Sequence, residues 1–230
     1  MTAAEPPTPV EPPAPAEPPT PSSHELTPGV RRVAAVVLAG GASRRFGSDK
    51  LATALDGVPL LEWAIAELPT DWPVILVGPT RQLSATLLAG RTVITVREEP
   101  AGSGPAAAVV AGVGAALSAG TAPRAEVVVT LPGDAPAGGA AARVLVGNLL
   151  DTTDPEPASA VVGVDVDGVE QPLQFAAKAS VLADLAARTD AAGLPARSLL
   201  TGLGRYRRVA LPAELTADVD TTDDLTTWRR

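Results

Sequence analysis

Short apolar runs rich in β-branched residues alternate along the chain with alanine- and leucine-rich stretches of helical length. A continuous apolar run predicts a strand that is buried on both faces. The repeated order of strand and helix therefore predicts an α/β protein with a mostly parallel sheet and helices on both faces. We expect strands at 33–38, 74–77, 92–96, 126–131, 160–164, 173–176 and 206–211, and helices at 59–68, 80–89, 105–118, 137–150, 180–188 and 197–203, with a short helix near the C-terminus.

Residues 1–29 do not follow this pattern. The first 28 residues hold 10 of the 24 prolines, and such a segment buries too little apolar surface to offset its ordering entropy. We expect a disordered, proline-rich tail at 1–29, passive rather than a docking segment, and one domain at 30–230. The tail lacks the features of a secretory signal, and no stretch reaches the roughly 20 apolar residues that span a bilayer, so we expect a cytoplasmic protein with no membrane partner.

The inventory of side chains limits the chemistry. The chain has no cysteine, and its one histidine, His24, lies in the tail, which excludes a zinc site of thiolates and imidazoles. A bound metal must therefore take oxygen ligands, which favours magnesium or manganese. The formal net charge of −8 argues against nucleic acid as a partner. Lys50 and Lys178 are the only lysines among 18 lysine and arginine residues, which indicates a special use for a compact positive charge.

The segment after the first expected strand carries the strongest candidate chemistry. In an open α/β sheet the ligand lies at the carboxyl ends of the strands. Gly40 and Gly41 let backbone amides approach a ligand, and turning amides of this kind form a nest for phosphate oxygens. Arg44, Arg45 and Lys50 add positive charge, so the loop predicts a polyphosphate site. The spacing matches neither the P-loop nor the dinucleotide fingerprint, which argues against a Rossmann dehydrogenase.

Residues 38–50 read Leu-Ala-Gly-Gly-Ala-Ser-Arg-Arg-Phe-Gly-Ser-Asp-Lys. This loop closely resembles the signature Leu-Ala-Gly-Gly-x-Ser-x-Arg-Phe-Gly-x-Asp-Lys of the molybdenum cofactor guanylyltransferases, and the resemblance covers about 200 residues, everything beyond the tail. It implies a Rossmann-like, three-layer α/β/α nucleotidyltransferase fold with a mostly parallel mixed sheet. It also implies a magnesium-dependent enzyme that transfers GMP from GTP to the phosphate of molybdopterin-bound molybdenum and releases pyrophosphate, with molybdoenzymes or cofactor-pathway proteins as partners.

The resemblance also assigns roles to single residues. Arg45 and Lys50 lie on the motif and would be catalytic, because they neutralise charge on the leaving pyrophosphate. Asp134 follows the fourth expected strand and matches the family's magnesium-binding aspartate, although Pro-Gly-Asp is also an ordinary turn sequence. Nucleotide contacts would come from Leu38, Ala39, Gly40, Gly41, Ser43, Lys50, Glu98, Glu99, Gly104 and Asp134.

Two of these assignments depart from the family's pattern or are weak without it. After the third expected strand the family has an aspartate that contacts the nucleotide, whereas this chain has glutamates, and the spacing leaves Glu98 and Glu99 both eligible. Gln171 and Pro172 match a His/Gln-Pro-Leu element in the family's acceptor-substrate region. Without the resemblance they would simply mark the entry of a strand at a proline.

Residues 218–225 resemble the family's Asn-x-Asn-Thr-Pro-Glu-Asp-Leu, with both asparagines replaced by aspartates. Asp220 or Asp218 would complete the metal site or face the pterin substrate. We assign Asp220 to the metal with Asp134, and Asp218 to the acceptor substrate. A helix N-cap at Thr221 or Thr222 is compatible with either role.

Two rival functions remain open from the sequence. The first is the same chemistry with another nucleotide, such as cytidylyl transfer from CTP, because the residues that read the base are not evident. The second is a catalytically silent nucleotide-binding or scaffold protein whose tail recruits a partner. The motif residues Arg45, Lys50 and Asp134 argue against the second rival.

Overall fold

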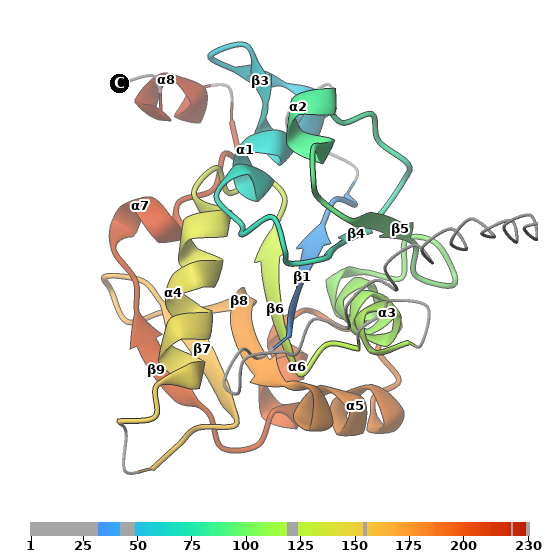
Figure 1. The fold of residues 1–230 in the computed structure, drawn as a ribbon, viewed down its shortest axis with the longest axis vertical. Coiled ribbons are helices and arrows are strands. Elements are labelled where there is room, and N and C mark those ends of the chain that lie inside the picture. The colour runs from blue at the N-terminus through green and yellow to red at the C-terminus, as the bar shows by residue number, and fades with distance from the viewer. Residues whose placement is uncertain (1–31, 42–48, 119–123, 154–155, 222, 229–230) are drawn as a thin grey trace, which may run out of the picture. The chain divides into compact units, whose positions relative to one another are not determined.

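One mixed sheet of seven strands forms the centre of the computed structural model, which describes residues 32–41, 49–118, 124–153, 156–221 and 223–228 (Figure 1). The predicted tail at 1–29 lies outside these residues. The strands of the sheet are β1 Val33–Leu38, β4 Val74–Val77, β5 Val93–Val96, β6 Val127–Pro132, β7 Ala160–Val164, β8 Glu170–Lys178 and β9 Arg207–Ala210. Their order is β5-β4-β1-β6-β8-β7-β9, and among these described strands β8 alone runs antiparallel to its neighbours.

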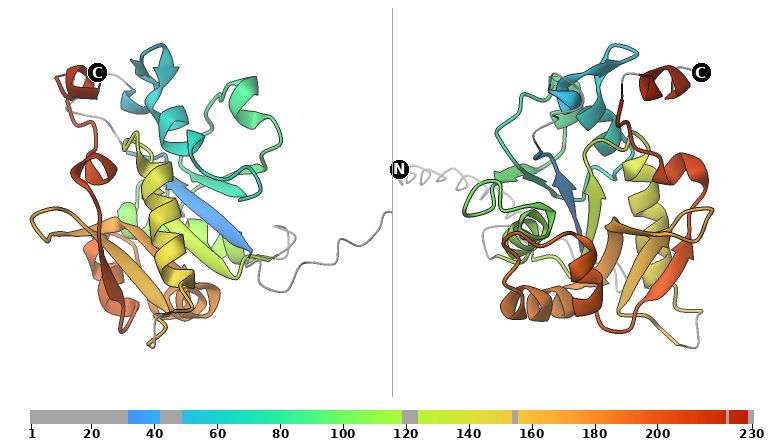
Figure 2. Two further views of the ribbon diagram at one scale, coloured as in Figure 1. Left: turned by 60° about the vertical axis from the view of Figure 1, so that its left-hand side comes forward. Right: turned by 180° about the vertical axis from the view of Figure 1, so that it is seen from behind.

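Helices cover both faces of the sheet. In the described residues they are α1 Leu60–Ala66, α2 Ala85–Leu88, α3 Pro105–Leu117, α4 Gly138–Leu150, α5 Ala179–Arg188, α6 Arg197–Gly202, α7 Ala213–Thr216 and α8 Asp224–Trp228. Residues of α1 and α4 pack in the apolar core on one face, and residues of α3, α5 and α6 pack in the core on the other. In the left view of Figure 2, α4 lies in front of the sheet.

The interior strand β1 is apolar throughout because both of its faces are buried. Ala35 and Val37 point into the core beneath α1 and α4, whereas Ala34 and Val36 point into the core beneath α3. All four residues are at most 2% exposed. A strand covered on both faces has no position that tolerates a solvated polar side chain. The predicted α/β fold, with three layers and a mostly parallel mixed sheet, is confirmed.

The helix predicted at 80–89 is wrong in its first half. The structure has helix only at Ala85–Leu88, because Ser84 ends the preceding extended segment and caps the helix by accepting a hydrogen bond from the Leu87 amide. The Glu62 carboxylate accepts from both the amide and the hydroxyl of Ser84, at 2.7 and 2.6 Å. This contact between Glu62 of α1 and Ser84 holds the residue at which α2 begins. The sequence of residues 80–89 alone does not predict the contact.

A two-stranded hairpin, β2 Ala54–Leu55 and β3 Val58–Pro59, precedes α1 and was not among the expected elements. Its turn is Asp56-Gly57, and both residues have positive φ, 50° and 83°. An Asp-Gly pair between short strands is a strong local signal for such a turn. The sequence therefore contained the signal, although each strand has only two residues.

The carboxyl ends of the parallel strands meet along one edge of the sheet. Leu38 is in register with Val77 on one side and with Pro132 on the other. Gly133 lets the segment after β6 approach β1, since a Cβ there would lie 2.7 Å from the Leu38 carbonyl oxygen. Gly78 does the same after β4, where a Cβ would lie 2.7 Å from the carbonyl oxygen of Ala39. The segments that carry the candidate chemistry therefore leave the sheet side by side.

Two glycines of α3 provide a matched test of this packing. A Cβ on Gly112 would lie 2.8 Å from Val77 and closer still to Val36, whereas Gly114 is exposed with open space around it. Gly112→Ala is expected to lower the free energy of unfolding by about 1–3 kcal/mol through overpacking. Gly114→Ala should instead raise it by up to about 1 kcal/mol, because alanine favours helix. Urea unfolding measures both; equal effects of the two changes would contradict the close contact of α3 with the sheet.

Candidate active site

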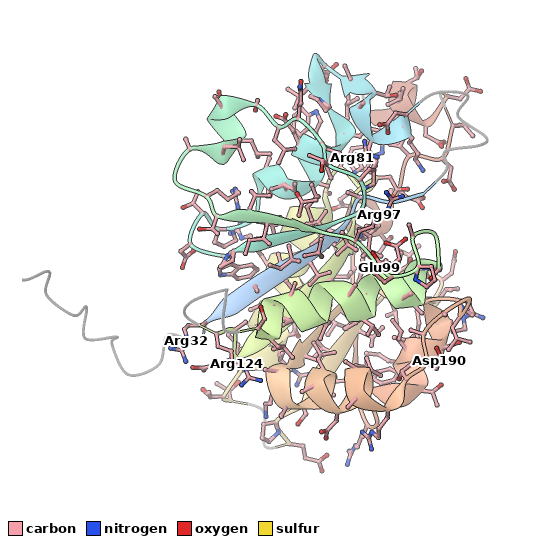
Figure 3. All side chains as sticks on the ribbon, turned by 90° about the vertical axis from the view of Figure 1, so that its right-hand side faces the viewer. Arg32, Arg81, Arg97, Glu99, Arg124 and Asp190 are labelled. Atoms are coloured by element: carbon pink, nitrogen blue, oxygen red, sulfur yellow. The ribbon has the colours of Figure 1, made fainter. Side chains whose placement is uncertain are left out.

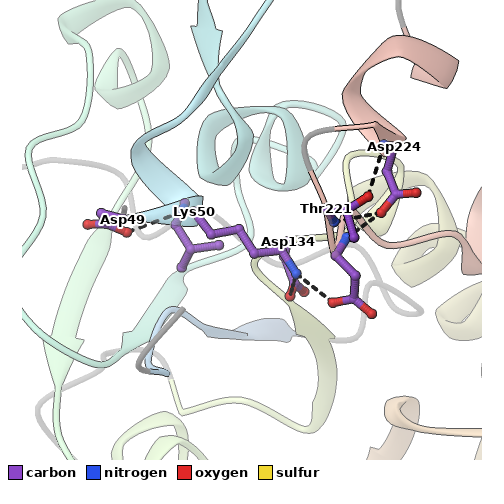
Figure 4. Close-up of polar contacts among 7 residues, drawn as sticks. Asp49, Lys50, Asp134, Thr221 and Asp224 are labelled. Atoms are coloured by element: carbon purple, nitrogen blue, oxygen red, sulfur yellow. Dashed lines mark hydrogen bonds and ion pairs between the residues drawn. The ribbon is translucent and has the colours of Figure 1, made fainter. Parts of the chain in front are cut away.

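The side chain of Lys50 lies at the centre of a charged cluster on the carboxyl edge of the sheet. Its ammonium group donates to Asp134 Oδ2 at 2.8 Å and to Asp220 Oδ1 at 2.9 Å (Figure 4). Lys50 is only 8% exposed, so its charge needs these partners. The two aspartates are 84 and 170 positions away in the chain. The contact therefore joins the segment after β1, the segment after β6 and the C-terminal segment.

Local structure orients each charged residue. Asp49 caps a 3₁₀ turn at Lys50–Ala52 by accepting from the Leu51 amide at 3.2 Å, which fixes the backbone of Lys50. The Asp134 carbonyl accepts from the amide of Val219 at 3.0 Å. Val219 is fully buried with apolar side chains of the hairpin, α1 and α8, so the C-terminal segment is anchored beside Asp134.

The start of α8 holds Asp220 in place. The Asp224 carboxylate accepts from the amides of Asp220 and Thr221 at 2.8 and 2.7 Å, and the Thr221 hydroxyl accepts from the Asp224 amide at 3.4 Å. This reciprocal arrangement is a capping box. Thr221 makes the side-chain contact expected of an N-cap, although α8 itself begins at Asp224, and Thr222 lies outside the described residues.

Asp218 joins the same cluster. Oxygen atoms of Asp134, Asp218 and Asp220 all lie within 4.8 Å of one another. Partial burial raises the pKa of Asp218, and the neighbouring Asp220 and Asp134 carboxylates raise it further, while Lys50 opposes this shift. Desolvation lowers the pKa of Lys50, but its hydrogen bonds to Asp134 and Asp220 outweigh that effect, so the pKa is raised overall.

The charges and atoms of this cluster suit a hard divalent cation. Three carboxylates and one ammonium group leave a formal charge of −2. Magnesium takes oxygen ligands at about 2.0–2.1 Å in an octahedron, so its ligand atoms are at most about 4.2 Å apart. The three aspartates place one oxygen each within 4.8 Å of one another, which is close enough for them to converge on one ion. The donor set therefore fits the metal that the sequence predicts.

The structure describes only part of the loop that was predicted to bind phosphates. Leu38 ends β1, and Ala39 leads from it into Gly40 and Gly41; Gly41 has a φ of 116° that glycine adopts without strain. Ser43, Arg45 and the other residues of 42–48 lie outside the described residues. The roles assigned to Ser43 and Arg45 therefore stay predictions.

Arg81 is a site residue that the sequence reasoning missed. Its Nε donates to the Ala39 carbonyl at 3.1 Å, and its Nη1 lies 2.5 Å from Asp49 Oδ2. The hydrogen bond from Arg81 lowers the pKa of Asp49, against a smaller opposing effect of burial. Figure 3 shows Arg81 on the segment after β4. The available signal is an arginine four positions after β4, close to a strand's carboxyl end, whereas the candidate residues named from the sequence follow the first, third and fourth expected strands.

The acidic segment after β5 is organised by its own turn. Glu98 accepts a hydrogen bond from the amide of Gly102 at 2.8 Å, so its carboxylate closes the loop to which it belongs. Gly104 has a φ of 94° and is the N-cap of α3. Figure 3 shows Arg97 and Glu99 at this end of the sheet and Arg124 at the opposite end. Glu99 thus remains eligible for a nucleotide contact, while Glu98 has a structural task.

The expected acceptor residues divide into two places. Because β8 is antiparallel to β6 and pairs Phe175 with Thr130, Gln171 and Pro172 near its start lie toward the edge that carries Asp134. The side-chain amide of Gln171, however, donates to Asp165 Oδ2 at 3.0 Å, so this side chain is held by the turn before β8. The structure brings Asp218 together with the two expected metal ligands instead.

Glycine turns, a lysine and clustered aspartates at the carboxyl edge of an α/β sheet are typical of a nucleotide-binding protein. The family model described as "MobA-like NTP transferase domain" matches residues 35–209. The chain therefore belongs to this family and is a nucleotidyltransferase, as the motif at 38–50 predicts. The match includes Lys50 and Asp134, whereas Asp218 and Asp220 lie beyond it.

Solved structures share the fold of this chain. The homologue of Mycobacterium tuberculosis Rv0371c from Mycobacterium sp. strain JC1 has 26% identity and a TM-score of 0.59, covering 87% of this chain and 96% of its own. The molybdopterin-guanine dinucleotide biosynthesis protein A of Archaeoglobus fulgidus has 20% identity and a TM-score of 0.57, covering 84% and 95%. The inositol-1-phosphate CTP transferase of T. maritima has 16% identity and a TM-score of 0.60, covering 85% and 92%. The last two likenesses show the fold alone.

A search of curated protein sequences returns no match to the chain. None of the helices in the described part of the chain combines the length and apolar character that crossing a bilayer requires.

Removal of one carboxylate tests the charge balance of the site. Asp218→Asn is expected to raise the free energy of unfolding at neutral pH by up to about 1 kcal/mol, because it removes the repulsion between this carboxylate and those of Asp134 and Asp220. The raised pKa of Asp218 means that its carboxyl group holds a proton more tightly in the folded protein than in the unfolded chain. The free energy of unfolding therefore falls as the pH rises from the ordinary pKa of aspartate to the raised pKa of Asp218. The gain should therefore be present at neutral pH and vanish in acid.

Urea unfolding at several pH values measures this difference. The matched control is Asp71→Asn, at an exposed aspartate in the turn before β4, which should show no such pH-dependent gain. An Asp218→Asn variant that is less stable than the wild type at neutral pH would contradict the repulsion among the three carboxylates.

Proposed function

We propose that this nucleotidyltransferase moves GMP from GTP to the phosphate of molybdopterin-bound molybdenum cofactor and releases pyrophosphate. The observation that carries the proposal is the contact of Lys50 with Asp134 and Asp220 at the end of the glycine loop. The full motif at 38–50 and the family match support the guanylyl-transfer chemistry. The fold shared with the Archaeoglobus fulgidus molybdopterin-guanine dinucleotide biosynthesis protein A is consistent with it.

The reaction we propose is an in-line displacement at the α-phosphorus of GTP. A phosphate oxygen of the acceptor forms the new bond, and the bond to the pyrophosphate oxygen breaks. The acceptor phosphate is already anionic near neutral pH, so no general base is needed. Catalysis then depends on positioning and on neutralising charge.

Each part of the site has a task in this reaction. The backbone amides at Gly40 and Gly41 bind phosphate oxygens, and the Lys50 ammonium exchanges a carboxylate contact for the phosphate charge that enters the site. Asp134 and Asp220, with Asp218 beside them, would hold magnesium, or manganese. When bound, that ion supplies charge neutralisation at the α-phosphate. Arg45 is proposed to neutralise the leaving pyrophosphate.

CTP is the second candidate nucleotide. The inositol-1-phosphate CTP transferase of T. maritima shares this fold, and the glutamates at 98 and 99 replace the aspartate of the guanylyltransferase pattern. A panel of nucleotides with magnesium and molybdopterin, followed by pyrophosphate release, separates the two candidates. Release with GTP and not with CTP supports the proposal. Release with CTP alone makes the protein a cytidylyltransferase, and nucleotide binding without any release makes it a silent binding protein.

The two lysines of the chain provide the sharpest test of the catalytic role. Lys50→Ala is expected to lower kcat about 10²-fold or more, since one preorganised charge on a reacting phosphate is typically worth this much. Lys178→Ala is the matched control, because Lys178 ends β8 and pairs with Val127 at the opposite edge of the sheet. Steady-state pyrophosphate release measures both variants. Undiminished turnover in Lys50→Ala would remove Lys50 from the mechanism.

A further inference from the structure

Arg81 connects the two ends of the segment that carries the phosphate-binding motif. Its Nε donates to the carbonyl of Ala39, the second residue of the motif, at 3.1 Å. Its Nη1 forms an ion pair of 2.5 Å with Asp49, the residue before Lys50. One guanidinium group thus bridges the start and the end of a thirteen-residue motif, 38–50.

The two contacts connect to fixed parts of the fold. Ala39 is fully buried, and its amide donates to the Val77 carbonyl at 2.8 Å, so the start of the motif is an extension of the sheet. The side chain of Arg81 is 12% exposed, whereas that of Asp49 is 51% exposed. Arg81 is therefore the buried, anchored partner, and Asp49 is the partner that it restrains.

Asp49 transmits this restraint to Lys50. Its Oδ2 accepts a hydrogen bond from the Arg81 guanidinium. Its Oδ1 accepts from the Leu51 amide at 3.2 Å and caps the turn that begins at Lys50. Without Arg81, the Asp49 carboxylate has no buried cation to orient it. Its position over the 3₁₀ turn then depends on the hydrogen bond from the Leu51 amide. The direction in which Lys50 leaves the backbone then depends on a mobile side chain.

We propose that Arg81 is a positioning residue of the nucleotide site. It joins the carbonyl of Ala39 to the carboxylate of Asp49 and orients Lys50 through Asp49, and its two hydrogen bonds are made to protein atoms. The inference rests on the proposed function of this site. It assigns a specific role to the segment after β4, which neither the motif nor the charged cluster includes.

The expected effect of Arg81→Ala is a loss of nucleotide affinity of about tenfold, together with a lower kcat, in a protein that still folds. Arg81→Lys should recover only part of the affinity, because lysine is a single point charge and lacks the planar fork that serves two acceptors. Asp49→Asn should have a similar effect, and the double variant should be no worse than the stronger single variant, because both changes break one contact.

Arg91→Ala is the matched control. Arg91 donates to the carbonyls of Leu68 and Pro69 at 2.9 and 3.1 Å, so it is also an arginine that ties backbone segments together, but it does so away from the motif. Its loss should lower stability and leave nucleotide affinity unchanged. This contrast separates a role in the nucleotide site from a general contribution to folding.

Calorimetric titration of the full chain with magnesium and GTP measures these affinities without the acceptor, and CTP replaces GTP if the wild type binds only CTP. Thermal unfolding followed by circular dichroism verifies that each variant is folded. Wild-type affinity in both Arg81→Ala and Asp49→Asn would overturn the role of Arg81 while leaving the proposed function intact. A wild-type protein that binds neither nucleotide would overturn the proposed function, and the positioning role with it.

Discussion

The ammonium group of Lys50, held between the carboxylates of Asp134 and Asp220, is the contact on which the organisation of the site depends. A lysine that is 8% exposed carries a charge that needs partners, and the side chains of Asp134 and Asp220, 29% and 61% exposed, supply them from the solvent side. Two segments distant in the chain must therefore meet the end of the glycine loop whenever the protein folds. The sheet provides the edge at which they meet, and the capping box at Thr221 fixes the last of them.

The same contact explains why a site for anions contains so many aspartates. In the proposed function, Lys50 and the backbone amides would bind phosphate while Asp134, Asp218 and Asp220 would hold a cation, so the cluster would take a nucleoside triphosphate together with a metal. Arg81 adds a second layer, because it restrains Asp49 and through it the turn that presents Lys50. Membership of the MobA-like nucleotidyltransferase family is consistent with this combination.

Much of this architecture could be predicted from the sequence, because strands covered on both faces must be apolar and because Lys50 and Asp134 lie on recognisable motifs at strand ends. The onset of α2 could not, since it depends on the contact of Glu62 with Ser84. The pairing of Lys50 with Asp220 likewise needs the position of Val219 in a core assembled from distant residues. Arg81 was within reach of the strand-end rule, but its two partners are visible only in three dimensions.

A double-mutant cycle on stability tests the central claim most directly. The free energy of unfolding is measured by urea denaturation for the wild type, Lys50→Met, Asp134→Asn and the double variant. If this partly buried ion pair organises the site, the two changes are strongly non-additive, with a coupling of about 1–3 kcal/mol and a double variant more stable than the sum of the single changes implies. A coupling near zero would mean that Lys50 and Asp134 contribute independently, and it would contradict the account given above.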